Sequence, residues 1–181
     1  MESIFSLKNI EIRLQGSIQK FLSEFSLTEN NQDIMSLCIY FDDVNISVCI
    51  SLYTKKDYLK GIDVGDVPAW TFHDICNMHH DDEDLRDDFE ALSAFITSSY
   101  DSIQSNEVGP SLRVDLVLTR FRHIIYNIIE NLSYEGLNRT DDFFTWACDL
   151  YGVHDSLYET VPNWILEKYF PGLIERLDKV K

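Results

Sequence analysis

The sequence predicts an α+β fold in which helices pack on one face of a small antiparallel sheet. Three observations carry this prediction. Apolar residues recur at helical spacing in three long stretches, two β-rich runs flank a turn-forming cluster, and Gly and Pro number only 7 and 4 of 181 residues. With 45% apolar residues the chain can bury a substantial core, so we expect one domain over residues 1–181.

The N-terminal segment predicts an amphipathic helix over about residues 3–26. Apolar residues recur there with helical spacing, and charged residues lie between them. Gly16 weakens the middle of this helix, because glycine has a low helix propensity. The predicted apolar stripe consists of Ile4, Leu7, Leu14, Ile18, Phe21, Leu22 and Phe25.

Residues 34–54 predict a β-hairpin, because the runs IMSLCIYF and ISVCISLYT flank the turn-forming residues DDVN. If DDVN closes the hairpin, Phe41 lies opposite Ile46, and Cys38 lies opposite Cys49. One face of the hairpin is then wholly apolar, because side chains alternate with a period of two. We expect the facing cysteines to be buried thiols in a reducing compartment rather than a disulfide.

The segment from residue 61 to residue 109 is the acidic segment of the chain. It contains twelve Asp and Glu residues and a single base, Arg86. A helix is predicted within it by the stripe Leu85, Phe89, Leu92, Ile96, Tyr100 and Ile103. Asp84, Asp87, Asp88 and Glu90 are then directed toward solvent near the helix N-terminus, where the helix dipole favours negative charge.

The remaining elements lie between residue 111 and the C-terminus. A central buried helix is predicted over about residues 111–135, with Pro110 near its start and Gly136 as its stop. In the segment 140–181, the aromatic residues at 143–150 favour a strand, although Thr140 is also a possible helix cap. Pro162 opens a short helix after it.

The charge balance excludes several classes of partner. The chain carries 31 Asp and Glu against 15 Lys and Arg, a formal net charge of −16. Such a chain repels nucleic acid and anionic membrane surfaces, whereas opposite charge favours a basic protein partner. The N-terminal residues MESIFSLKNIEIRLQ contain no signal-peptide core, and no stretch is long enough to span a membrane, so we expect a cytoplasmic location.

A metal-dependent enzyme is the alternative that the residues around His73 suggest. On a helix, His73, Cys76 and His80 would share one face, and an acidic neighbour such as Asp74, Asp81 or Glu83 would complete a zinc site. Structural zinc sites usually join two separated ligand pairs, and no second Cys/His pair occurs. Motifs of nucleophilic and phosphate-binding sites are also missing, so we expect neither an enzyme nor a metal or other cofactor.

The acidic segment is the stronger candidate for a functional surface. Its simplest interpretation is a solvated face, but its charge is concentrated, and such crowding costs the folded state self-repulsion. We therefore predict a surface that binds a Lys/Arg-lined cleft, with Trp70, Phe72 or a nearby Tyr as the aromatic anchor. The acidic residues of this predicted surface are Asp63, Asp66, Asp81, Asp82, Glu83, Asp84, Asp87 and Asp88.

The order of these features resembles a family of small bacterial α+β domains found among immunity proteins of polymorphic-toxin and contact-dependent growth inhibition systems. The most specific matching stretches are VPAW followed by His73, and TDDFFTWACDL, in which that family places a strand ending in an Asp, here Asp149. The resemblance implies a protein that binds and neutralises a cognate toxin domain, commonly a nuclease. A basic nuclease would suit the acidic surface, because its substrate cleft is cationic.

Overall fold

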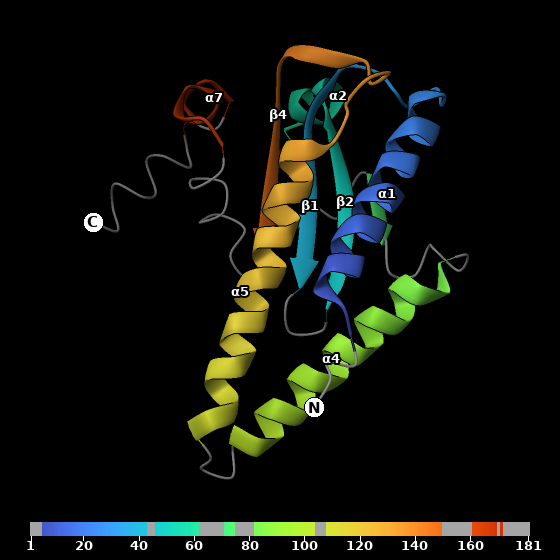
Figure 1. The fold of residues 1–181 in the computed structure, drawn as a ribbon. Helices are drawn as coiled ribbons and strands as arrows, with labels where there is room; N and C mark the ends of the chain where they lie inside the picture. The colour runs from blue at the N-terminus through green and yellow to red at the C-terminus, as the bar shows by residue number, and fades with distance from the viewer. Residues whose placement is uncertain are drawn as a thin grey trace.

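The computed structural model describes residues 5–42, 46–61, 71–74, 82–103, 108–149, 161–169 and 171. Its centre is a four-stranded sheet with the strand order β3–β2–β1–β4 (Figure 1). The strands are β1 (Ile34–Asp42), β2 (Ser47–Thr54), β3 (Thr71–Asp74) and β4 (Arg139–Asp149). The helices are α1 (Leu7–Ser26), α2 (Lys55–Leu59), α4 (Glu83–Ile103), α5 (Val108–Asn131) and α7 (Asn163–Tyr169). The fold class is α+β, as the sequence predicts.

Helices α1, α4 and α5 cover one face of the sheet, which we call the helix face (Figure 1). The described residues of the apolar stripes predicted for α1 and α4, together with apolar residues of α5, form the core between these helices and the strands. Phe121 of α5 lies at its centre, because its ring packs edge-to-face against Phe41 of β1 and Phe89 of α4, with centroids 6.4 and 6.3 Å away. The core thus joins two helices and the sheet through one side chain.

The long helices differ from their predicted bounds at the ends. α1 begins at Leu7 rather than near residue 3, because the Ser6 side chain caps it by accepting a hydrogen bond from the Asn9 N–H at 3.2 Å. α5 ends at Asn131 rather than near residue 135. Its end is fixed by α1, since Gln19 exchanges two hydrogen bonds with the backbone of Ser133.

The hairpin forms over the predicted residues, but its register is shifted by two. Phe41 pairs with Val48 rather than Ile46, and Cys38 lies opposite Ser51 rather than Cys49. Ile46 lies in the turn before β2 with a φ of 47°, so it cannot be the first paired residue of that strand. A shift of two residues leaves every side chain on its predicted face, because the faces alternate with a period of two.

The sheet is mixed rather than purely antiparallel, which corrects the prediction. The strand predicted at 143–150 is confirmed as β4, but it runs parallel to β1. Both strands begin at the same end of the sheet, where Asn31, which precedes β1, binds the residues that precede β4. Its side chain donates to the carbonyl of Gly136 at 2.9 Å and accepts from the N–H of Asn138 at 2.8 Å. α5 lies between β1 and β4 in the chain, and a parallel pair needs such a long crossover.

The other face of the sheet, which we call the reverse face, carries a second apolar cluster. Ile165 and Leu166 of α7 pack there against the strands and are 0% and 1% exposed, so not every helix lies on the helix face. Asp142 of β4 ties α7 down, because it accepts hydrogen bonds from Tyr169 and, at 2.7 Å, from Lys168. The bond from Lys168 holds the pKa of the Asp142 carboxyl below its ordinary value.

Three cysteines of the sheet are buried free thiols, as predicted for Cys38 and Cys49. Burial raises the pKa of Cys38 well above its ordinary value, and a hydrogen bond with Cys148 adds to this effect. A thiol that keeps its proton at neutral pH is a poor nucleophile. Cys38 therefore acts as a core residue.

We expect replacement by alanine to have opposite effects on stability at two glycines. Gly136 has a φ of +86°, and an added Cβ would lie 3.3 Å from the Ser26 side chain, so we expect Gly136→Ala to lower the free energy of unfolding by about 1–2 kcal/mol. Gly16 is exposed on α1 with no atom within 4 Å of an added Cβ, so Gly16→Ala should raise it by about 0.5–1 kcal/mol. Urea denaturation measures both, and equal effects would contradict the conformation of Gly136.

Candidate functional site

The residues of the predicted acidic surface divide into two groups. Asp82, Glu83, Asp84, Asp87 and Asp88 lie at or just before the start of α4. Asp63, Asp66, Trp70 and Asp81 lie outside the described residues, as do Cys76 and His80 of the alternative metal site. The structure therefore tests the geometry of the second half of the acidic surface.

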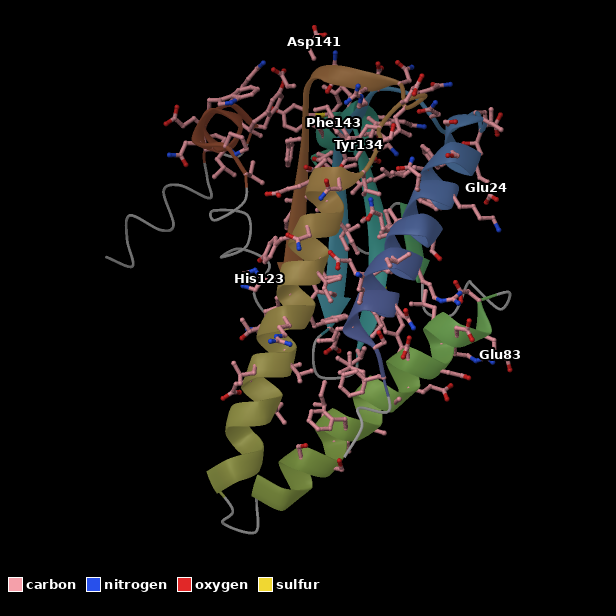
Figure 2. All side chains as sticks on the ribbon, viewed as in Figure 1. Glu24, Glu83, His123, Tyr134, Asp141 and Phe143 are labelled. Atoms are coloured by element: carbon pink, nitrogen blue, oxygen red, sulfur yellow. The ribbon has the colours of Figure 1, made fainter. Side chains whose placement is uncertain are left out.

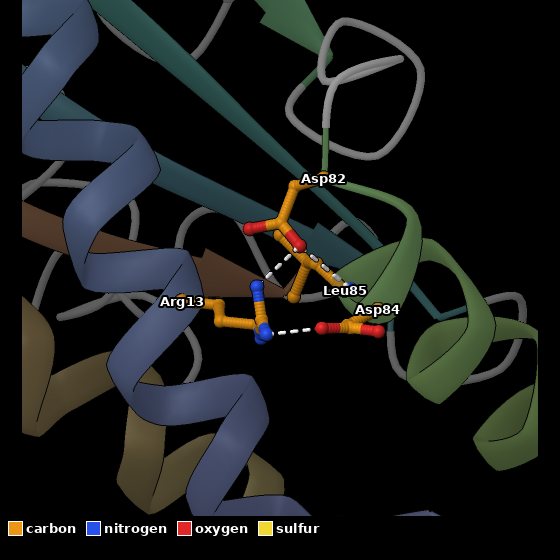
Figure 3. Close-up of polar contacts among 4 residues, drawn as sticks. All are labelled: Arg13, Asp82, Asp84 and Leu85. Carbon is orange, nitrogen blue, oxygen red and sulfur yellow. Dashed lines mark hydrogen bonds and ion pairs between the residues drawn. The ribbon is translucent and has the colours of Figure 1, made fainter.

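Asp82 and Asp84 bind Arg13 of α1 (Figure 3). The Arg13 guanidinium donates to Asp82 at 2.8 Å and to Asp84 with its other terminal nitrogen. Asp82 also caps α4, because its carboxylate accepts the N–H of Leu85 at 3.0 Å. The Asp82 side chain is only 22% exposed, so its charge serves contacts within the fold.

Asp88 also holds α1 in place, which corrects the expectation that it is directed freely toward solvent. Its carboxylate accepts the backbone N–H of Ser6 at 2.8 Å, and Asp88 is half-buried. Ser6 is the residue that caps α1, so Asp88 fixes the position at which this helix begins. Together with Arg13, it attaches the start of α4 to the first half of α1.

Three other acids in the first half of α4 form an exposed acidic face, which we define as Glu83, Asp87 and Glu90. The side chains of Glu83 and Asp87 are 79% and 65% exposed, and Glu90 is exposed as well. Spacings of four and three residues place all three on one side of the helix, and Figure 2 shows Glu83 at its outer end. Glu90 belongs to this face, although the predicted partner-binding set ends at Asp88.

Arg86 neutralises little of this negative charge. Its guanidinium nitrogens lie 3.7 Å from Glu83 and 3.9 Å from Asp87, which are long distances for ion pairs. Exposed pairs of this kind contribute about 0–1 kcal/mol and leave the carboxylates accessible to a stronger cationic partner. The exposed acidic face can therefore bind Lys and Arg side chains of another molecule without breaking the contacts that hold α4.

The helical arrangement assumed for the alternative metal site does not hold at its first residue. His73 lies in β3 opposite Ile50 of β2, so it does not share a helix with Cys76 and His80. Within the described ranges, no three side chains among His, Cys, Asp and Glu gather closely enough to hold a metal ion. Of the predicted ligand set, the structure describes the side chain of Glu83, which is exposed on α4.

An exposed aromatic residue occurs at a position that the sequence analysis did not select. Trp164 of α7 is 52% exposed, yet α7 and α4 lie at opposite sides of the molecule in Figure 1. Trp164 is therefore not part of the exposed acidic face. A signal for it was present, since a Trp beside a buried Ile-Leu pair on a short helix must lie partly outside the core.

Comparison with known proteins finds no matching protein family, no matching curated protein and no matching solved structure. Among the described residues, none of the helices combines the length and the apolar character needed to cross a bilayer.

Proposed function

We propose that this protein binds and neutralises a toxin domain, in the manner of an immunity protein, by covering a cationic cleft. One structural observation carries the proposal. α4 presents the carboxylates of Glu83, Asp87 and Glu90 on one exposed side, and Arg86 is the only Lys or Arg in the sequence of that helix. The resemblance of the chain to immunity domains supports the same conclusion.

The proposed mechanism is electrostatic occlusion without turnover. A net charge of −16 attracts a basic protein over a distance, and the exposed acidic face of α4 then pairs with Lys and Arg at the contact. The suited partner is a nuclease domain, since its cleft must be cationic to bind phosphates. We place this encounter in the cytoplasm, where the buried thiols stay reduced.

The test removes the exposed carboxylates while preserving the attachment of α4 to α1. With the cognate toxin domain as its partner, the triple variant Glu83→Gln, Asp87→Asn, Glu90→Gln should associate about three- to tenfold more slowly at low salt. Its association rate should also depend less steeply on salt, because fewer charges steer the encounter. Stopped-flow association at several salt concentrations measures both effects.

A matched control removes three charges elsewhere. Glu24, Glu130 and Asp141 are exposed and lie outside α4, and Figure 2 shows Glu24 and Asp141 away from Glu83. The variant Glu24→Gln, Glu130→Gln, Asp141→Asn should retain most of the association rate. An equal loss in both variants would assign the effect to net charge alone, and an unchanged rate in the α4 variant would refute the proposal.

Asp82 and Asp88 are unsuited to this test because they hold the fold, and Asp84 is unsuited because it pairs with Arg13 of α1. Replacing them would remove both Asp82 bonds, the Arg13 contact to Asp84 and the Ser6 contact to Asp88. A loss of binding in such a variant could then arise either from a displaced α4 or from a missing contact with the partner. Thermal unfolding of the α4 triple variant should stay close to that of the wild type, since all three replaced residues are exposed.

A further inference from the structure

The centre of the reverse face contains polar side chains that the fold buries completely. Ser36 of β1, Ser51 of β2 and Trp146 of β4 are each 0% exposed. Among the described residues, the hydroxyl oxygens of both serines and the indole nitrogen of Trp146 find no hydrogen-bond partner. We call these three residues, with Cys38 between them, the buried polar patch.

Strand register brings the members of the buried polar patch together. Cys38 lies directly opposite Ser51 on β2 and opposite Trp146 on β4. Ser36 is two residues before Cys38 on the same strand and so lies diagonal to both Ser51 and Trp146. Direct cross-strand neighbours have Cβ atoms about 5 Å apart and diagonal ones about 7–8 Å, so a small molecule can bridge them.

Leaving such groups without a partner is unfavourable, because each has lost its hydration and gained no hydrogen bond in return. Within the part of the chain that the structure describes, no protein group makes a hydrogen bond with these three polar atoms. The Cys38 thiol is a weak hydrogen-bonding group, and the Trp146 indole is a donor that needs an acceptor. Val161, Ile165 and Leu166 belong to the same cluster and exclude bulk solvent, but they offer no polar side-chain atom.

The strand register also gathers small side chains at the buried polar patch. Ser36, Cys38 and Ser51 are small side chains in adjacent register positions. Tyr53 and Phe144 lie opposite Ser36 on the two neighbouring strands. Small polar side chains on neighbouring strands suit a water molecule, which needs two to four polar partners.

We propose that the buried polar patch is a binding site for ordered water between the sheet and α7. One water molecule accepts the indole N–H of Trp146 or a serine hydroxyl and donates to another serine oxygen, so it satisfies groups on neighbouring strands. Water fits because the site offers both donors and acceptors and no charged side chain. The proposal is independent of the partner-binding function of α4.

The serine hydroxyls provide the test, since their removal has opposite consequences with and without water. With bound water, Ser36→Ala and Ser51→Ala should each lower the folding equilibrium constant about three- to tenfold. The double variant should lose less than the product of the two factors, because the first substitution already breaks the shared bridge. If the hydroxyls are truly unpaired, each substitution should instead raise the constant, and this result would overturn the proposal.

Ser47→Ala is the matched control, because Ser47 lies on β2, on the same face as Ser51, and is only half-buried. It reports the effect of the same substitution on strand propensity alone, and the factors above are taken relative to it. A crystal structure of the wild-type chain at better than about 2 Å resolution gives the second measurement. Water oxygens within about 3.2 Å of two of the three polar atoms support the proposal, and their absence from clear density overturns it.

Discussion

Replacing Phe121 with alanine should lower the free energy of unfolding by about 3–5 kcal/mol, the range for truncating a fully buried aromatic side chain. Phe121 is 0% exposed and contacts Phe41 of β1 and Phe89 of α4 edge-to-face. The substitution therefore leaves a cavity at the place where α4, α5 and the sheet meet, and it also removes two aromatic pairs. Urea denaturation followed by far-UV circular dichroism measures the loss.

A control on the same helix separates this effect from helix propensity. Leu116 is also a large apolar residue of α5, but it is 57% exposed. Leu116→Ala should change the free energy of unfolding by no more than about 0.5 kcal/mol. Comparable losses from the two substitutions would contradict the packing of α5 on the helix face. If the Phe121 variant does not fold, Phe121→Leu should give a smaller and measurable loss.

The helices of the helix face were predictable because their information is local. A stripe such as Leu85, Phe89, Leu92 and Ile96 specifies both the helix and the side that it buries, and all four residues are at most 4% exposed. Alternation within 34–54 specified the hairpin and its two faces in the same way. Its register depended instead on the backbone conformation of Ile46, which apolar alternation does not report.

The direction of β4 lay beyond these local patterns. The residues of a strand do not determine whether it pairs in the parallel or the antiparallel direction. The parallel direction of β4 follows from the end of the sheet at which α5 returns the chain. Asn31 fixes that choice by joining the entrances of β1 and β4, yet it lies more than 100 residues before its partners Gly136 and Asn138. Its place in the sequence suggests only a polar turn.

The candidate site shows the same division between local and distant information. Charge density identified the start of α4 as an acidic surface, and the exposure of Glu83 and Asp87 agrees with that prediction. It could not separate these residues from Asp82, Asp84 and Asp88, whose partners Arg13 and Ser6 lie 69 to 82 residues away. Carboxylates of identical chemistry thus divide into contacts of the fold and a surface available to a partner.

Two neighbouring residues of α7, Trp164 and Ile165, should differ in what their truncation costs. We expect the smaller side chain to cause the larger loss of stability. Ile165 is 0% exposed against the reverse face, so Ile165→Ala should lower the free energy of unfolding by about 2–5 kcal/mol. Trp164 is larger but 52% exposed, and Trp164→Ala should cost far less, within about 1 kcal/mol. Urea denaturation of both variants gives the comparison.

The order of these two losses of stability shows which side of α7 packs against the sheet. The helix is attached through a polar contact and an apolar one. Lys168 and Tyr169 bind Asp142 near the surface, where exposed ion pairs contribute little, whereas Ile165 and Leu166 enter the cluster that contains Trp146. A greater loss for Trp164→Ala would mean that the opposite side of α7 faces the sheet. The stated order would mean that Ile165 and Leu166 extend the apolar cluster of the reverse face into a second core.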